Sequence, residues 1–249
     1  MSAPPPASVD PIGPRKSHPH EVLGVVAFFI LCGVILARLW TDRGISSMWI
    51  VAGTGLAGYL AADFTSGVVH WLFDTWGSPK TPVVGATFVT PFRIHHVDPK
   101  DITRHGFIAT NGHNCLVSLP VMVGGLLLPH TGWSSAALSF LLALCLGVFA
   151  TNQFHKWSHE DEAKLHPFIL WLQRYGIILS PEHHDVHHTA PYSRHYCITT
   201  GWLNRPLEAI GFFRGLERII TAVTSVPPRV NDLALTDAGS LDEPPAASA

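Results

Sequence analysis

The sequence is poor in charged residues. Only 14% of its 249 residues are Asp, Glu, Lys or Arg, whereas 47% are hydrophobic. Because an ordinary soluble domain contains about 25% charged residues, the composition favours a membrane protein. The formal net charge of -2 argues against nucleic acid as a general partner, since binding phosphates requires a basic face.

Cysteine is scarce, and two common metal motifs are absent. The four cysteines form no Cys-x-x-Cys pair, and Cys32 and Cys145 lie inside apolar runs. This excludes a disulfide framework and is typical of reduced thiols on a cytoplasmic side. The sequence contains no Glu-x-x-His, the motif of soluble di-iron bundles, and no His-Glu-x-x-His, the motif of zinc hydrolases.

Long apolar runs predict an all-α integral membrane protein with about four transmembrane helices. The predicted spans are residues 22–40, 48–72, 115–128 and 135–154, of which the third is short for a membrane. Residues 168–179 suit an interfacial or buried helix. We expect a single membrane domain over residues 22–230, because the Pro- and Ala-rich residues 1–21 and 231–249 are typical of a disordered leader and tail.

Lysine and arginine are distributed unevenly around these spans. Residues 1–21 contain two, residues 71–114 contain four, and the chain from residue 155 onward contains eight, whereas the turn between the third and fourth spans has none. The positive-inside rule then places both termini in the cytoplasm. Every histidine cluster falls on that side, which in a bacterium would be the inner face of the inner membrane.

Four histidines lie within residues 183–188. Ser180 can cap a helix that starts with Pro181, and about two turns of helix are predicted. On such a helix His183 pairs with His187, and His184 pairs with His188. Residues four apart lie on one face with side chains about 6 Å apart, so each pair could chelate a metal ion.

Further histidines repeat this pattern at the ends of the predicted spans. His155 and His159 are four residues apart where the fourth span ends. His95 and His96 are adjacent and would point about 100° apart on a helix, so they would serve different ions, or one would orient a ligand. His70 ends the second span.

An acidic stripe accompanies His70. Asp63, Gly67, His70 and Asp74 fall on one helical face, and Asp74 could orient His70 through its other ring nitrogen. Asp63 is an acid within a span, where it would serve either the site or helix packing and substrate contact.

Nine histidines are therefore candidate metal ligands, and they are too many for one ion. Two ions are the economical interpretation, but imidazole suits several metals and does not select one. The candidate ligands are His70, His95, His96, His155, His159, His183, His184, His187 and His188.

Other polar residues are candidates for orienting the ligands or for binding substrate. Arg93, Lys100 and Arg104 could meet a lipid phosphate, although a solvated loop face explains them equally well. The candidates for orienting or additional roles are His105, Asp63, Asp74, Asn111, Asn152 and Asp185.

Long motifs in the chain resemble the Kua-type lipid desaturase family. The resemblance covers roughly residues 60 to 220. Its motifs are ADFTSGVVHW (62–71), DTWGS (74–78), PFRIHH (91–96), ITRH (102–105), TNG (110–112), TNQFHKWSH (151–159), SPEHHDVHH (180–188) and YCITTGWLN (196–204).

The resemblance implies O2-dependent desaturation of a lipid chain at two histidine-bound irons, with His105 as a further site residue. Electrons would come from a cytochrome b5 or ferredoxin type donor. In the plasmalogen branch of the family, an ethanolamine ether lipid's 1-O-alkyl chain becomes a 1'-alkenyl (vinyl ether) chain. A related plant branch desaturates an acyl chain of phosphatidylglycerol, and the metal motifs do not separate the two.

Two other functions are alternatives to desaturation. A lipid hydroxylase could share the same metal site and electron donor. A metal transporter would also account for histidines and spans, but transporter sites lie near the bilayer midplane. Here the histidines cluster at the ends of spans and in the segments between them.

Overall fold

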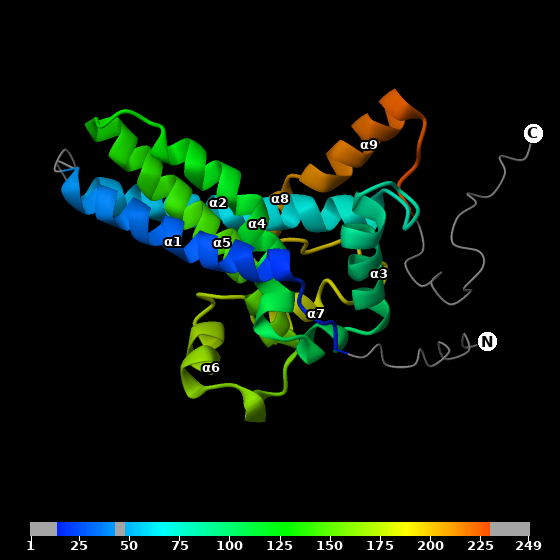
Figure 1. Cartoon of the computed structure of the whole chain (residues 1–249). Helices are drawn as coiled ribbons and strands as arrows, with labels where there is room; N and C mark the ends of the chain where they lie inside the picture. The colour runs from blue at the N-terminus through cyan, green and yellow to red at the C-terminus, as the bar shows by residue number, and fades with distance from the viewer. Residues whose placement is uncertain (1–13, 43–47, 230–249) are drawn as a thin grey trace, which may run out of the picture.

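The structure, a computed structural model, describes residues 14–42 and 48–229. Its architecture is a bundle of four long helices with short helices gathered at one end (Figure 1). In chain order the helices are α1 (Pro19–Thr41), α2 (Met48–Thr75), the π-helix η1 (Gly85–Val89), α3 (Thr90–Val97), the 3-10 helix η2 (Asp101–Arg104), α4 (Phe107–Leu126), α5 (Gly132–His159), the 3-10 helix η3 (Glu162–Lys164), α6 (Pro167–Arg174), α7 (Pro181–Asp185), α8 (Asn204–Ala209) and α9 (Phe212–Thr224).

The described residues contain no strand, in agreement with the predicted all-α class. Among them, α1 and α5 are the helices long and apolar enough to cross a membrane. The helices at the second and third predicted spans, α2 and α4, do not meet that criterion, although both pack in the bundle beside α1 and α5. Four spans therefore remain a prediction.

The third predicted span is longer in the structure than its apolar run. α4 begins at Phe107, well before Cys115, and includes a polar first half. Asn111 Nδ2 donates to Gln153 Oε1 at 3.0 Å, and Asn114 Nδ2 donates to the Val148 carbonyl at 2.7 Å. Because α5 satisfies these amides, the polar turns of α4 can be helical inside the bundle.

The first helix begins three residues before the predicted start of the domain at residue 22, and the predicted end of the domain lies outside the described residues. α1 begins at Pro19, within the predicted leader, and Arg15 forms an ion pair with the buried Glu21 at 2.8 Å. Residues 1–13 and the predicted tail at 231–249 lie outside the described residues.

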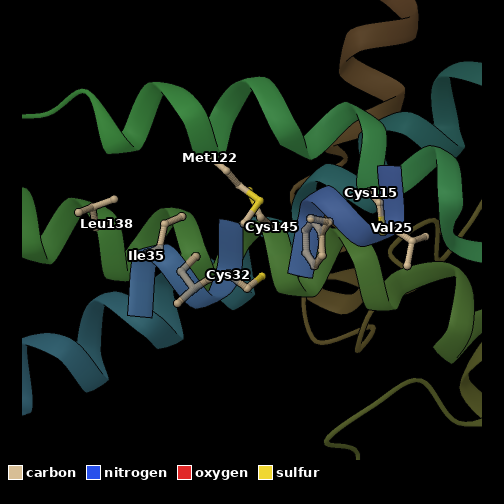
Figure 2. Close-up of a cluster of buried hydrophobic side chains, with 9 residues drawn as sticks. Val25, Cys32, Ile35, Cys115, Met122, Leu138 and Cys145 are labelled. Carbon is tan, nitrogen blue, oxygen red and sulfur yellow. The ribbon is translucent and has the colours of Figure 1, made fainter. Parts of the chain in front are cut away.

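The hydrophobic core lies between α1, α4 and α5 (Figure 2). Phe28 and Ile35 of α1, Met122 of α4 and Leu138 of α5 are completely buried there. Cys32, Cys115 and Cys145 fill the space between them as small apolar side chains, and none forms a disulfide.

Arg38 caps the C-terminus of α4 at the end of the bundle away from the histidines. Its side chain is buried and donates to the carbonyls of Leu126, Leu128 and Pro129 at 2.7, 2.7 and 3.0 Å. These carbonyls at and after the end of α4 have no helical partner, so the guanidinium caps them.

The segment after α7 is held to α2 by a buried carboxylate. Asp63 Oδ1 accepts hydrogen bonds from the backbone N–H groups of Thr200 and Gly201 at 2.8 and 2.9 Å, and Oδ2 accepts from Leu203 N at 3.1 Å. Ser66, one turn later, accepts from Ile198 N at 3.0 Å. One face of α2 thus fixes residues 196–203, which contain no regular helix or strand.

α2 and α5 approach closely through small residues. A Cβ added at Gly147 of α5 would lie 2.5 Å from Cβ of Ala62 on α2, closer than real Cβ atoms come. A Cβ added at Gly53 of α2 meets nothing within 4 Å. Position 147 therefore requires glycine, whereas position 53 borders open space and accepts a side chain.

We expect Gly147→Ala to destabilise the protein by about 1–3 kcal/mol, because overpacking forces the two helices apart. The matched control Gly53→Ala should keep or raise stability by up to about 1 kcal/mol, the difference in helix propensity. Thermal unfolding of both variants in the same detergent measures this. Equal midpoints for the two variants would contradict a close contact at Gly147.

Candidate metal centre

Eight of the nine candidate histidines converge in two largely buried groups at one end of the bundle. Within each group, one potential ligand atom per residue lies within 4.8 Å of all the others. The first group consists of His95, His155, His159, His184 and His188. The second group consists of His70, Asp74, His96 and His187.

The first group joins three helices. His155 and His159 stand one turn apart at the end of α5, His95 comes from α3, and His184 and His188 come from α7 and the turn after it. The Nε2 atoms of His155 and His188 lie 2.8 and 3.0 Å from Nε2 of His184, and that of His95 lies 3.1 Å from His188 Nε2.

These separations suit ligands of one metal ion. Ligands about 2.1 Å from an ion and about 90° apart are about 3 Å from each other. His184 Nε2 faces two other Nε2 atoms, and one ring proton cannot serve both contacts. His159 Nε2 is buried without a hydrogen-bond partner among the described residues. The donor set therefore fits a metal ion.

The second group surrounds one carboxylate oxygen. Asp74 Oδ2 lies 3.2 Å from His70 Nε2, 3.4 Å from His187 Nε2 and 3.6 Å from His96 Nε2. His96 and His187 are themselves in contact through Nε2 atoms 2.9 Å apart. Three imidazoles and a carboxylate are a donor set that also fits a divalent ion.

Backbone carbonyls orient two ligands of the second group. His70 Nδ1 lies 3.1 Å from the Tyr196 carbonyl oxygen, and His187 Nδ1 lies 2.8 Å from that of Arg194. A carbonyl can only accept, so Nδ1 carries the ring proton and Nε2 is left with its lone pair. Asp74, expected to hold the other nitrogen of His70, instead points its carboxylate at the Nε2 atoms.

Burial keeps three imidazoles of the first group, those of His95, His184 and His188, neutral. Desolvation, reinforced by the neighbouring histidines, lowers the pKa of His95 and of His184 well below the ordinary value. The same causes lower the pKa of His188 to about 2. Neutral imidazole is the form that binds metal ions, so these three histidines of the first group are ready to coordinate at neutral pH.

His183 lies outside both groups. Its Nε2 accepts from Asn204 Nδ2 at 3.0 Å, and its ring stacks on that of His195 with centroids 4.7 Å apart. The predicted cap is present, because Ser180 Oγ accepts from His183 N at 3.3 Å. The helix, however, ends at Asp185, sooner than predicted.

The tight turn after α7 separates His187 from His183 but leaves His188 beside His184. His187 N donates to the carbonyl of His184 at 2.8 Å, a 3-10 contact, while His188 N reaches the same carbonyl at 3.3 Å. His184 and His188 therefore remain together in the first group. The His187 side chain is directed away from His183 and lies in the second group.

The other candidates for orienting roles have different positions. Asn152 Nδ2 donates to the Thr110 carbonyl at 3.0 Å and, like Asn111, joins α4 to α5. His105 Nε2 lies 3.2 Å from Asp101 Oδ2. Asp185 is exposed. None of these side chains, nor that of Asp63, belongs to either group.

The three basic side chains that could bind a lipid phosphate form hydrogen bonds or ion pairs within the protein. Arg104 Nη2 contacts Asp98 and Asp101 at 2.6 and 2.8 Å, and Lys100 Nζ donates to the His159 carbonyl at 2.6 Å. Arg93 is buried and donates to the Gly77 carbonyl. Lys100 thus holds the end of α5 at the first group.

Sequence reasoning missed the orienting groups because they are backbone atoms. The Tyr196 and Arg194 carbonyls carry no side-chain signature. Tyr196 begins the motif at residues 196–204, which pointed to this segment, whereas Arg194 lies before that motif.

Comparison with known proteins identifies the family. The lipid desaturase domain matches residues 59–231. A plasmanylethanolamine desaturase of Myxococcus xanthus is 48% identical over 223 residues, covering 89% of this chain and 78% of that protein. Plasmanylethanolamine desaturase 1 of Mus musculus is 44% identical over 216 residues, covering 82% and 79%.

A plant relative is more distant. Fatty acid desaturase 4, chloroplastic, of Arabidopsis thaliana is 37% identical over 209 residues, covering 77% of this chain and 64% of that protein. No solved structure matches. With its apolar helices and buried histidine groups, the chain is a membrane oxidoreductase that belongs to the Kua-type lipid desaturase family.

Proposed function

We propose that this protein desaturates a membrane ether lipid, converting a 1-O-alkyl (plasmanyl) chain into a 1'-alkenyl (plasmenyl) chain. The observation that carries the proposal is the pair of buried ligand groups in a chain similar to two plasmanylethanolamine desaturases. An ethanolamine ether lipid is accordingly the proposed substrate.

Two iron ions would be held by the two groups, one by the five histidines of the first and one by the second. Bound iron would supply the activation of O2 needed to remove hydrogen from an unactivated carbon. The balanced reaction takes R–O–CH2–CH2–R', O2, two electrons and two protons to R–O–CH=CH–R' and two water molecules. A cytochrome b5 or ferredoxin type protein would deliver the electrons.

The chain's own residues would prepare this site in three ways. The Tyr196 and Arg194 carbonyls hold His70 and His187 with Nε2 directed inward. Asp74 offers a negative charge that offsets a cation among neutral imidazoles. All the proposed ligands except the half-buried His188 are buried, which limits the access of bulk water and so would protect the reaction from side reactions.

The topology proposed with this function has four spans, both termini in the cytoplasm and the ligand groups at the cytoplasmic end. α5 supports one part of it, because 28 helical residues extend about 42 Å, enough to cross a bilayer and project beyond it. His155 and His159 lie at one end of α5 and the lysine- and arginine-free turn at the other.

Desaturation of a phospholipid acyl chain is the second candidate function. It is favoured by the 37% identity to a fatty acid desaturase and would use the same ligand groups.

Lipid analysis separates the candidates. A host that makes no vinyl ether should form 1'-alkenyl lipids when it expresses this protein and receives an alkylglycerol lipid, with iron and a reductant system available. Mass spectrometry before and after mild acid, which cleaves vinyl ethers, gives the readout. New acyl double bonds alone would support the second function, and a hydroxylated lipid without an alkene would indicate a hydroxylase.

Adjacent histidines provide a matched test of the first group. We expect His184→Ala to abolish desaturation and lower the iron content, because His184 Nε2 lies between two other ligands. His183→Ala should retain the iron content, since that ring contacts Asn204 and His195 instead. Iron analysis of both purified variants is the measurement. Equal iron loss in the two would sink the assignment.

Asp74 can be tested in the same manner for the second group. Asp74→Asn should lower turnover at least about tenfold and reduce iron per chain, because it removes the charge that three Nε2 atoms face. Asp185→Asn removes the same charge from an exposed position and should match the unmodified protein. Full iron content in Asp74→Asn, with activity retained, would argue against a ligand role.

A further inference from the structure

α9 has an apolar face that the rest of the described chain leaves uncovered. None of its residues is buried, and the side chains of Ile219 and Val223 are 60% and 81% exposed. Gly211 and Ser225, both with left-handed backbone (φ 64° and 60°), delimit the helix. In Figure 1 α9 extends away from the bundle at the end where the short helices gather.

Aromatic contacts fix one side of α9 to α2. The ring of Phe212 lies 5.6 Å from that of Phe64, and Phe213 lies 5.6 Å from Trp71. Trp71 Nε1 donates to Glu217 Oε1 at 3.0 Å. The start of α9 is therefore attached to the bundle, and the direction of its free face is set by this attachment.

The polar side of α9 is cationic. The side chains of Arg214 and Arg218 are exposed and make no hydrogen bond within the described residues. The Arg214 charge acts on Glu208 of α8, which forms an ion pair with Arg194, and the one acid of α9, Glu217, accepts from Trp71. At 100° per residue, the two arginines lie on average about 140° around the helix from Ile219 and Val223. Apolar residues on one side and arginines on the other are typical of helices that lie in a membrane interface.

We propose that α9 binds the surface of the bilayer that holds the bundle, with Leu216, Ile219 and Val223 in the lipid and Arg214 and Arg218 at the phosphates. This rests on the membrane location that the proposed function requires. The attachment through Phe64 of α2 makes the free face of α9 continuous with the bundle itself.

The charges favour lipid over a second copy of the chain. Another α9 would bring the same two arginines and no unengaged acid to pair with them. Lipid phosphates supply the negative charge, and acyl chains cover the apolar side chains without a specific partner.

With α9 bound in this way, the lipid surface would lie close to the second ligand group. The Phe213 ring lies 5.0 Å from that of Tyr196, which in turn lies 5.4 Å from the ring of His187 and 6.0 Å from that of His70. The Tyr196 ring thus separates α9 from these two histidines. The depth of α9 in the bilayer would therefore set the distance between the second ligand group and the lipid.

Single-cysteine labelling of the full chain tests this inference. The environment-sensitive fluorophore NBD is attached to Ile219→Cys and Val223→Cys, with Arg214→Cys and Arg218→Cys as matched controls on the opposite side. Because the four native cysteines are buried, the unmodified protein measures background labelling. The proteins are reconstituted in phosphatidylethanolamine and phosphatidylglycerol vesicles, with and without nitroxide-labelled lipids.

At positions 219 and 223 we expect emission at shorter wavelength and loss of fluorescence with nitroxide lipids, and at 214 and 218 emission typical of water. Water-like emission at all four positions would overturn the proposal. Short-wavelength emission that nitroxide lipids do not quench would also overturn it, since protein would then cover the face. The readout needs no turnover, so either result leaves the proposed desaturation to be judged separately.

Discussion

The site depends on the hydrogen bonds by which α2 holds residues 196–203. The buried Asp63 carboxylate accepts three backbone N–H groups of this segment, and Ser66 accepts a fourth. Two turns after Asp63, His70 contacts the Tyr196 carbonyl. The helix that carries His70, a candidate ligand, therefore also fixes the backbone that orients its ring. A buried carboxylate with three donors is well satisfied, which explains an acid within an apolar helix without a role in the chemistry.

The same face of α2 shows what could be predicted from sequence and what could not. Helical periodicity correctly placed Asp63, Gly67, His70 and Asp74 on one stripe. It could not tell that the stripe would divide, with Asp63 and Gly67 facing the segment around Cys197 and only His70 and Asp74 reaching a ligand group. Periodicity gives the direction of a side chain on its helix, whereas its partners come from other elements, most of them more than a hundred positions away along the chain.

The cluster at residues 183–188 was informative about metal binding and misleading about pairing. Spacing of four residues predicted two equivalent pairs, which assumed a regular helix as far as His188. The 3-10 turn after Asp185 preserved one pair and divided the other, so that His187 and His184 serve different groups while His183 serves neither. No residue type in this stretch marks the change of pitch. The adjacent His95 and His96, which a helix directs about 100° apart, lie one in each group, and that they bind different ions stays a prediction.

Two groups rather than one follow from the elements that supply them. α5 contributes both of its histidines to the first group and α2 both of its ligands to the second, because residues four apart on a helix share a face. The two long helices pack closely through Gly147 and Ala62, which brings the two groups within one protein interior. α3 and residues 184–188 lie between the two groups, and each of these segments contributes histidines to both. The groups are therefore coupled mechanically: a shift of α3 or of the 184–188 turn would move ligands of both at once.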